Sequence, residues 1–250
     1  MNRTKLTTLI MGIFTVMACG HSTRPEQPSS RIEAQTDIIG DSTIYGLACD
    51  GCTDTILVLL RDIRSNPDTL NILNASRRHK VYGRLGIGDK VAVVRSATDS
   101  TVADLVIDIE SLRGKWCYEV MPTLRRRADM PEQSHEQLLK QMPDSMREAL
   151  MVPREYGFHI MGERNIRAIG TTFRTMSSDE ESPVEYPEAK RYRDWYLYNG
   201  MLVLSETKTD SLGQQHITHS DTAQLVMLRP DTLVLRFGQE VRGYYNKTDL

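Results

Sequence analysis

Short apolar runs separated by turn residues dominate the chain after about residue 42. In the first such region the runs are rich in β-branched side chains and are bounded by Gly, Asp and Ser, which is typical of strands. Ile107 and Ile109 alternate with acidic residues, as in a half-buried strand, whereas Ile56–Leu60 is continuously apolar and predicts a strand buried on both faces. Residues 42–110 are therefore predicted to form a small β domain, either an OB-like barrel or a sandwich.

In the second region, residues 111–250, the apolar runs and turn residues predict a series of antiparallel hairpins. Asn199-Gly200 stands between two apolar runs and predicts a two-residue hairpin turn, because both turn positions need positive φ. Pro230-Asp231 predicts the turn before a later strand. The runs from Trp116 onward suffice for eight or nine strands, enough to close a barrel that either holds one small ligand or is filled by side chains.

One segment of the second region, residues 130–153, departs from this pattern. Ser134 and Gln137 have the spacing of a capping box, and a helical apolar face follows. Pro143-Asp144 restarts a second short helix that is rich in Met and Leu. We expect this helical insert to lie over one end of the barrel, as a lid or as a plug that packs its apolar face on the barrel mouth.

The strand that opens the second region carries Gly114-x-Trp116. Together with the hairpins up to a closing "VRGYYN", this element resembles the lipocalin-like domains of Bacteroidetes lipoproteins. The resemblance implies a lipocalin-like antiparallel β-barrel over residues 111–250, with Trp116 plugging one end beneath the helical insert. The expected fold class is mainly β, with a small N-terminal β-barrel or sandwich followed by this larger barrel.

The charge balance and the motifs narrow the function. The chain has 31 basic and 33 acidic residues, a formal net charge of −2, which is not the balance of a nucleic-acid-binding protein. Gly-x-Ser-x-Gly and His-Glu-x-x-His motifs are absent from the sequence, and no cofactor fingerprint is evident. We therefore expect a protein that is not an enzyme and that has no cofactor.

The N-terminal residues predict export. Basic residues precede an apolar run that ends at Ala18, which is how a secretory signal peptide is built, and the run is too short to span a membrane. Val16-Met17-Ala18-Cys19 resembles the lipobox of bacterial lipoproteins. This implies a signal peptide over residues 1–18 and an acylated Cys19; an ordinary signal peptide is the alternative. Because no Asp follows Cys19, the resemblance favours the outer membrane over the inner one, and residues 19–41 are predicted to be a flexible tether.

Cys49 and Cys52 form a C-x-x-C pair just before a predicted strand. A redox catalyst places this motif at a helix N-terminus, and a zinc site needs a second pair of ligands, so a structural disulfide in an oxidising compartment is the favoured interpretation. Reduced buried thiols or pairing with Cys117 are the alternatives. The stretch "ACDGCTDT" also resembles the cysteine pair of copper-stress envelope lipoproteins, which would imply a redox or stress sensor.

Other candidate sites are weaker. His216 and His219 lie three apart, which places them on opposite faces of a strand, so a solvated hairpin is favoured over a metal site. The basic clusters Arg125–Arg127 and Arg77–Lys80 could contact phosphate or lipid headgroups, or simply be solvated.

The sequence thus predicts an envelope lipoprotein attached to the membrane through its N-terminal lipid. Its barrel would bind a small apolar or amphipathic ligand or another envelope protein. The alternative function is an envelope redox or stress sensor that acts through Cys49 and Cys52.

Overall fold

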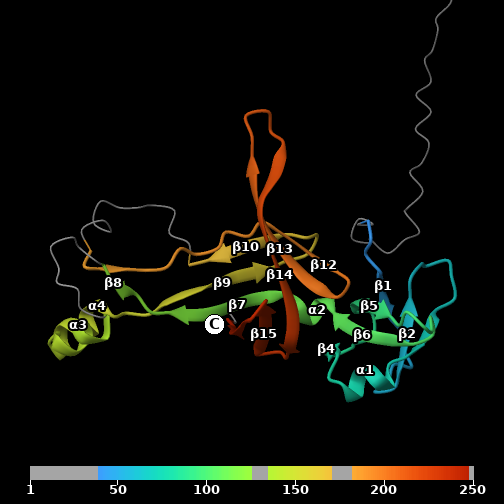
Figure 1. The fold of residues 1–250 in the computed structure, drawn as a ribbon. Coiled ribbons are helices and arrows are strands. Elements are labelled where there is room, and N and C mark those ends of the chain that lie inside the picture. The colour runs from blue at the N-terminus through green and yellow to red at the C-terminus, as the bar shows by residue number, and fades with distance from the viewer. Residues whose placement is uncertain (1–38, 126–134, 171–181, 248–250) are drawn as a thin grey trace, which may run out of the picture.

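The computed structural model describes residues 39–125, 135–170 and 182–247, and it is mainly β, as predicted (Figure 1). Cys19, the predicted signal peptide and the predicted tether up to residue 38 lie outside the described residues. No helix among the described residues is long and apolar enough to cross a membrane.

The N-terminal region forms one six-stranded sheet with the order β3-β2-β1-β5-β6-β4. All neighbouring strands are antiparallel except β4 and β6, which are parallel. The elements are β1 (Thr43–Ala48), β2 (Ile56–Leu60), β3 (Asp68–Asn71), α1 (Leu73–Arg77), β4 (Val81–Tyr82), β5 (Lys90–Arg95) and β6 (Ala103–Asp108).

The N-terminal sheet curls toward closure between β3 and β6. Asn71 forms a parallel bridge with Val102, and its N–H donates to the carbonyl of Thr101 (2.8 Å). The strands β1, β2, β3, β6 and β5 therefore follow one another around a small barrel, with α1 between β3 and β5 in the chain. This Greek-key order is that of an OB-like barrel. Its interior is filled by aliphatic side chains, among them Leu57, Leu59, Leu70, Ile72, Val91, Val93 and Val106.

The C-terminal region forms an eight-stranded antiparallel sheet with the order β10-β9-β7-β16-β15-β14-β13-β12. Except at β10 and β12, each of these strands pairs with the next one in the chain, and β16 returns to pair with β7, which is the connectivity of an up-and-down barrel such as a lipocalin. The strands are β7 (Gly114–Val120), β9 (Arg154–Ile160), β10 (Ile166–Ile169), β12 (Asp194–Tyr198), β13 (Met201–Thr209), β14 (Gln215–Leu228), β15 (Thr232–Phe237) and β16 (Glu240–Asn246). A separate two-stranded ribbon pairs β8 (Thr123–Leu124) with β11 (Val184–Glu185).

The barrel closes at a seam between β10 and β12. Asn165 bridges to Asp194, and the N–H of Trp195 donates to the carbonyl of Arg164 (2.9 Å). The guanidinium of Arg164 forms an ion pair with Asp194 and lies 4.7 Å from the ring centroid of Tyr196. Side chains thus join the two strands where the regular ladder stops.

The hairpin between β12 and β13 joins the two barrels. Asn199 and Gly200 both have positive φ (48° and 73°), which confirms the predicted Asn-Gly turn. The turn lies against the N-terminal sheet: the N–H of Ser42 donates to Oδ1 of Asn199, and the N–H of Asn199 donates to Asp41 Oδ1, both at 2.8 Å. A Cβ at Gly200 would lie 3.0 Å from a methyl group of Leu105, so the close approach favours glycine.

One hydrophobic core runs from the N-terminal sheet through α2 (Ile109–Leu112) into the C-terminal barrel. The hydroxyl of Tyr82 donates to the carbonyl of Leu225 at 2.7 Å, and the indole N–H of Trp116 donates to the carbonyl of Leu112 at 2.8 Å. Both rings are buried. Trp116 does close one end of the barrel interior, but it packs beneath α2 and not beneath the helical insert as predicted.

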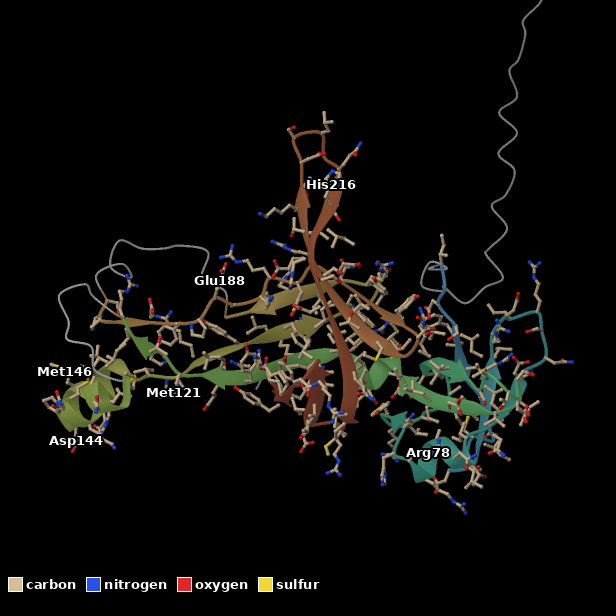
Figure 2. The ribbon with its side chains drawn as sticks, viewed as in Figure 1. Arg78, Met121, Asp144, Met146, Glu188 and His216 are labelled. Carbon is tan, nitrogen blue, oxygen red and sulfur yellow. The ribbon has the colours of Figure 1, made fainter. Side chains whose placement is uncertain are left out.

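The helical insert consists of α3 (His135–Gln141) and α4 (Asp144–Leu150). The two helices lie at the end of the molecule farthest from β1 and β2 (Figure 1). No residue of α4 is buried, and Met146, which Figure 2 labels, is 52% exposed. The helices were predicted correctly, but the expectation that their apolar face closes the barrel mouth is wrong.

Replacing Trp116 with Ala should destabilise the protein by about 3–5 kcal/mol, because it empties the core shared by both barrels and orphans the carbonyl of Leu112. Urea unfolding followed by far-ultraviolet circular dichroism measures this. Tyr245→Ala, on the outer face of β16 and 39% exposed, is the control and should cost much less. Equal urea midpoints for parent and Trp116→Ala would contradict the shared core.

Candidate ligand-binding site

The barrel interior has a filled end and a hollow end. Near α2 the inward-facing side chains are large and fully buried, and they leave little room for a ligand: Trp116, Ile160, Trp195, Leu197, Leu202, Leu204, Leu233 and Leu235. Toward the other end a cavity of about 240 Å³ remains. This volume is slightly below the range of about 300–1,000 Å³ that is common for small-molecule pockets, so only a small ligand fits.

Half of the residues that line the cavity are aromatic: Tyr118, Tyr156, Phe158, Tyr192, Phe237 and Tyr244. Phe158 and Tyr244 lie 5.1 Å apart between ring centroids, and Tyr118 meets Tyr244 edge-to-face at 5.3 Å. Such edge-to-face contacts hold the rings in defined positions. The wall is therefore a preformed apolar surface that carries several hydroxyl groups.

Strand alternation explains why these residues face inward. On β7, Trp116 and Tyr118 point into the barrel while Cys117 points out; on β16, Arg242 and Tyr244 point in while Val241, 53% exposed, points out. The same alternation that places apolar residues at the filled end therefore places a cation inside the hollow end.

Arg242 is the inward cation. Its guanidinium lies 4.6 Å from the ring centroid of Tyr118, and its Nη1 donates to the Tyr118 hydroxyl at 2.8 Å. Its Nε and Nη2 donate to one oxygen of Glu240 at the rim. Burial lowers the pKa of Arg242, but the hydrogen bond to Glu240 and the neighbouring tyrosines outweigh it and raise that pKa, so the group stays charged.

Asp221 is the inward anion, and its oxygens are already occupied. The hydroxyl of Tyr192 donates to it at 2.6 Å, the ring of His219 lies 3.0 Å away, and Lys190 forms an ion pair at 3.4 Å. Burial raises the pKa of Asp221, but these hydrogen bonds and the charge of Lys190 outweigh burial and lower that pKa overall. The carboxylate therefore remains ionised. Asp221 thereby anchors Tyr192 in the wall.

The cysteine pair lies in the connection between β1 and β2, in the other barrel. Cys49 and Cys52 are free thiols in the structure and are partly buried. The thiol of Cys52 donates to the carbonyl of Cys49 (3.1 Å) and its sulfur accepts from the N–H of Val58 (3.4 Å). β2 follows the pair, so no helix N-terminus adjoins the thiols. The predicted disulfide stays a prediction.

Cys117 lies apart from that pair, on the outer face of β7 between its partners Gly157 and Tyr245. It is fully buried, and burial together with the nearby Glu155 raises the pKa of its thiol. A neutral, buried thiol of this kind is unreactive.

His216 and His219 lie on β14 within a long hairpin that projects from the barrel (Figures 1 and 2). All residues from 211 to 220 are exposed, which confirms the solvated hairpin. A bulge separates the two histidines, and they bond to different acids, Asp210 and Asp221. Among the described residues, no group of three or more His, Cys, Asp and Glu side chains is placed to hold a metal ion.

The basic clusters are not brought together with the cavity. Arg77 and Arg78 lie exposed at the end of α1, where Figure 2 labels Arg78. Arg125 pairs with Glu185 at 3.8 Å, beside the two-stranded ribbon, and Arg126 and Arg127 lie outside the described residues.

Sequence reasoning identified the barrel but not the residues of its cavity. The signal was available: Arg242 and Tyr244 alternate on one strand, and Tyr118 stands two residues after Trp116, so each pair shares a face. The sequence pattern does not indicate that β7 and β16, which carry these residues, are neighbours in the sheet.

Comparisons with known proteins add little to this geometry. No family model matches the chain, and no curated protein matches it. Among solved structures, the chain is similar to a lipocalin-like protein from Bacteroides thetaiotaomicron, with 13% identity and a TM-score of 0.28, over 55% of this chain and 97% of that one. The barrel assignment therefore rests on the strand order and closure described above.

We expect the Cys49–Cys52 pair to behave as a clip when oxidised. Hydrogen bonds already hold the connection, since the N–H of Cys49 donates to the carbonyl of Val58 at 2.8 Å, and a short loop gains little closure entropy. Its reduction midpoint should lie below about −300 mV, measured by mass-tag trapping of thiols in graded dithiothreitol buffers. The Cys49→Ser variant is the tagging control. A midpoint between about −270 and −120 mV would instead support the redox sensor.

Proposed function

We propose that this protein is a non-enzymatic lipoprotein of the cell envelope whose C-terminal barrel binds a small amphipathic ligand at its hollow end. The observation that carries the proposal is the aromatic cavity with charged groups that face inward. Placing charged side chains inside a barrel costs folding free energy. The other end of the same barrel is filled by apolar side chains, so packing alone does not require charged residues in the interior. A retained cavity with convergent polar groups is the usual form of a ligand site.

Binding fits the arrangement better than catalysis does. The charged groups at the cavity form closed pairs, Arg242 with Glu240 and Lys190 with Asp221. Among the described residues that line the cavity, Ser, Thr and Cys are absent. The Tyr192 hydroxyl donates to Asp221, but burial and this hydrogen bond raise the pKa of Tyr192, which makes it a weak nucleophile. The arrangement orients a ligand and leaves its bonds intact.

The location in the envelope rests on the sequence around Cys19. Two or three acyl chains, at about 0.8 kcal/mol per buried methylene, would hold the protein on a membrane almost permanently. Absence of Asp after Cys19 favours the outer membrane. The segment up to residue 41 would then separate the barrels from the lipid surface and leave the hollow end open to solutes or to an envelope partner.

Filling the cavity should abolish ligand binding. N-phenyl-1-naphthylamine, an uncharged fluorescent probe, should brighten and saturate with the purified Cys19→Ser protein, in which no attached acyl chain competes. Ala189 lines the cavity, so Ala189→Trp should weaken probe binding at least about 10-fold, which is about 1.4 kcal/mol. Leu212→Trp, on the exposed hairpin turn at 82% exposure, is the matched control and should bind as the parent does. Equal loss in both variants, or no binding by the parent, would contradict the ligand site.

The membrane anchor is tested separately through Cys19. Cells that express the parent and are fed a radioactive fatty acid should incorporate label into the protein, and the Cys19→Ser variant should carry none and leave the membrane fraction. Cys49→Ser, which keeps the proposed acylation site, should still be labelled. Label that persists in Cys19→Ser would disprove the lipoprotein assignment.

A further inference from the structure

Donors and acceptors are unequally available inside the hollow end of the barrel. An arginine carries five N–H donors, and Arg242 uses three: Nε and Nη2 donate to Glu240, and Nη1 donates to Tyr118. The Tyr244 hydroxyl also forms a hydrogen bond with Arg242, which leaves one N–H donor for a ligand. The Asp221 carboxylate is more fully occupied by contrast, because it already meets Tyr192, His219 and Lys190.

Two tyrosine hydroxyls extend this donor set. Tyr118 accepts from Arg242, which leaves its own O–H available as a donor. Tyr244 lies two residues from Arg242 on the inward face of β16, with its ring 5.3 Å from that of Tyr118. Burial raises the pKa of both tyrosines, against the opposing charge of Arg242, so both hydroxyls keep their protons at neutral pH.

The position of Arg242 also argues against a cationic ligand. A cation would bind best on the face of an exposed aromatic ring, and the guanidinium of Arg242 already lies over Tyr118. The remaining wall, with Tyr156, Phe158 and Phe237, offers apolar surface next to this donor cluster. One side of the cavity therefore suits an acceptor group, and the other suits an apolar ring or chain.

We infer that the ligand is a small organic acid, whose anionic group is bound by Arg242, Tyr118 and Tyr244 and whose apolar part packs on the aromatic wall. This inference rests on the proposed function and names its ligand class. Glu240, whose side chain is 59% exposed at the rim, competes with the ligand for the guanidinium. Binding should therefore weaken with added salt and strengthen when Glu240 loses its charge.

A matched pair of probes tests this. N-phenyl-1-naphthylamine and 8-anilinonaphthalene-1-sulfonate share one skeleton, and only the second carries an anionic group. Arg242→Met should reduce affinity for the sulfonate about 10- to 100-fold, the effect of a lost charge-assisted hydrogen bond, and should change affinity for the neutral probe less than about 3-fold. Tyr118→Phe should act in the same direction with a smaller factor.

Two further variants separate recognition from folding. Glu240→Gln should raise affinity for the sulfonate several-fold while leaving the affinity for the neutral probe and the urea midpoint unchanged. Partial unfolding would instead expose apolar surface to both probes and lower the urea midpoint. Lys190→Met removes a cation that is already paired with Asp221, and it should change the ratio of the two affinities less than about 3-fold. Urea midpoints of all variants are measured alongside.

The outcomes are distinct. If the parent binds neither probe, the proposed ligand site itself fails. If the parent binds the neutral probe, but Arg242→Met changes both affinities by one common factor, or Glu240→Gln does not raise affinity for the sulfonate, the site stands and the organic-acid inference is wrong.

Discussion

The core shared by the two barrels, centred on Trp116 and α2, is the constraint on which the rest of the structure depends. The N-terminal sheet supplies Tyr82 and Ile107 to it, and the C-terminal barrel supplies Trp116, Leu225 and Leu235. Because apolar area must be buried on both sides of α2, this end of the large barrel is sealed by protein. In the part of the chain that the structure describes, the cavity therefore lies toward the opposite end.

The hollow end shows what a barrel needs in order to hold polar groups inside. Arg242 and Asp221 are inward-facing charges, and each is compensated by a counter-ion and by a tyrosine hydroxyl. The two clusters differ in their contacts, since the Asp221 carboxylate meets three protein groups while the Arg242 guanidinium keeps an unused N–H donor. The inferred preference for an anionic ligand depends on this difference, because the lining holds two cations, Lys190 and Arg242, and two anions, Asp221 and Glu240.

Tertiary structure overrode some local patterns. The apolar face of the insert predicts burial, yet α4 buries none of its residues, because the helices lie beyond the strands that could cover them. At the β9–β10 turn, Glu163 and Arg164 both adopt positive φ (54° and 62°), which neither residue type favours. The ion pair of Arg164 with Asp194 across the barrel seam offsets the cost of this backbone conformation. No local sequence pattern predicts that ion pair.

The sequence by itself determined what depends on neighbours along the chain: mainly β structure, the Asn199-Gly200 turn, the hairpin order of the second region and the two short helices. These follow from side-chain alternation and turn chemistry, which act over a few residues. Only the tertiary structure decided which end of the barrel is sealed and which residues line the cavity. Those features depend on contacts between distant segments, such as Tyr82 with Leu225 and Arg242 with Tyr118, which lie 143 and 124 residues apart. An alternating strand shows that Arg242 and Tyr244 share a face, but only the closed sheet shows that this face meets Tyr118 inside a barrel.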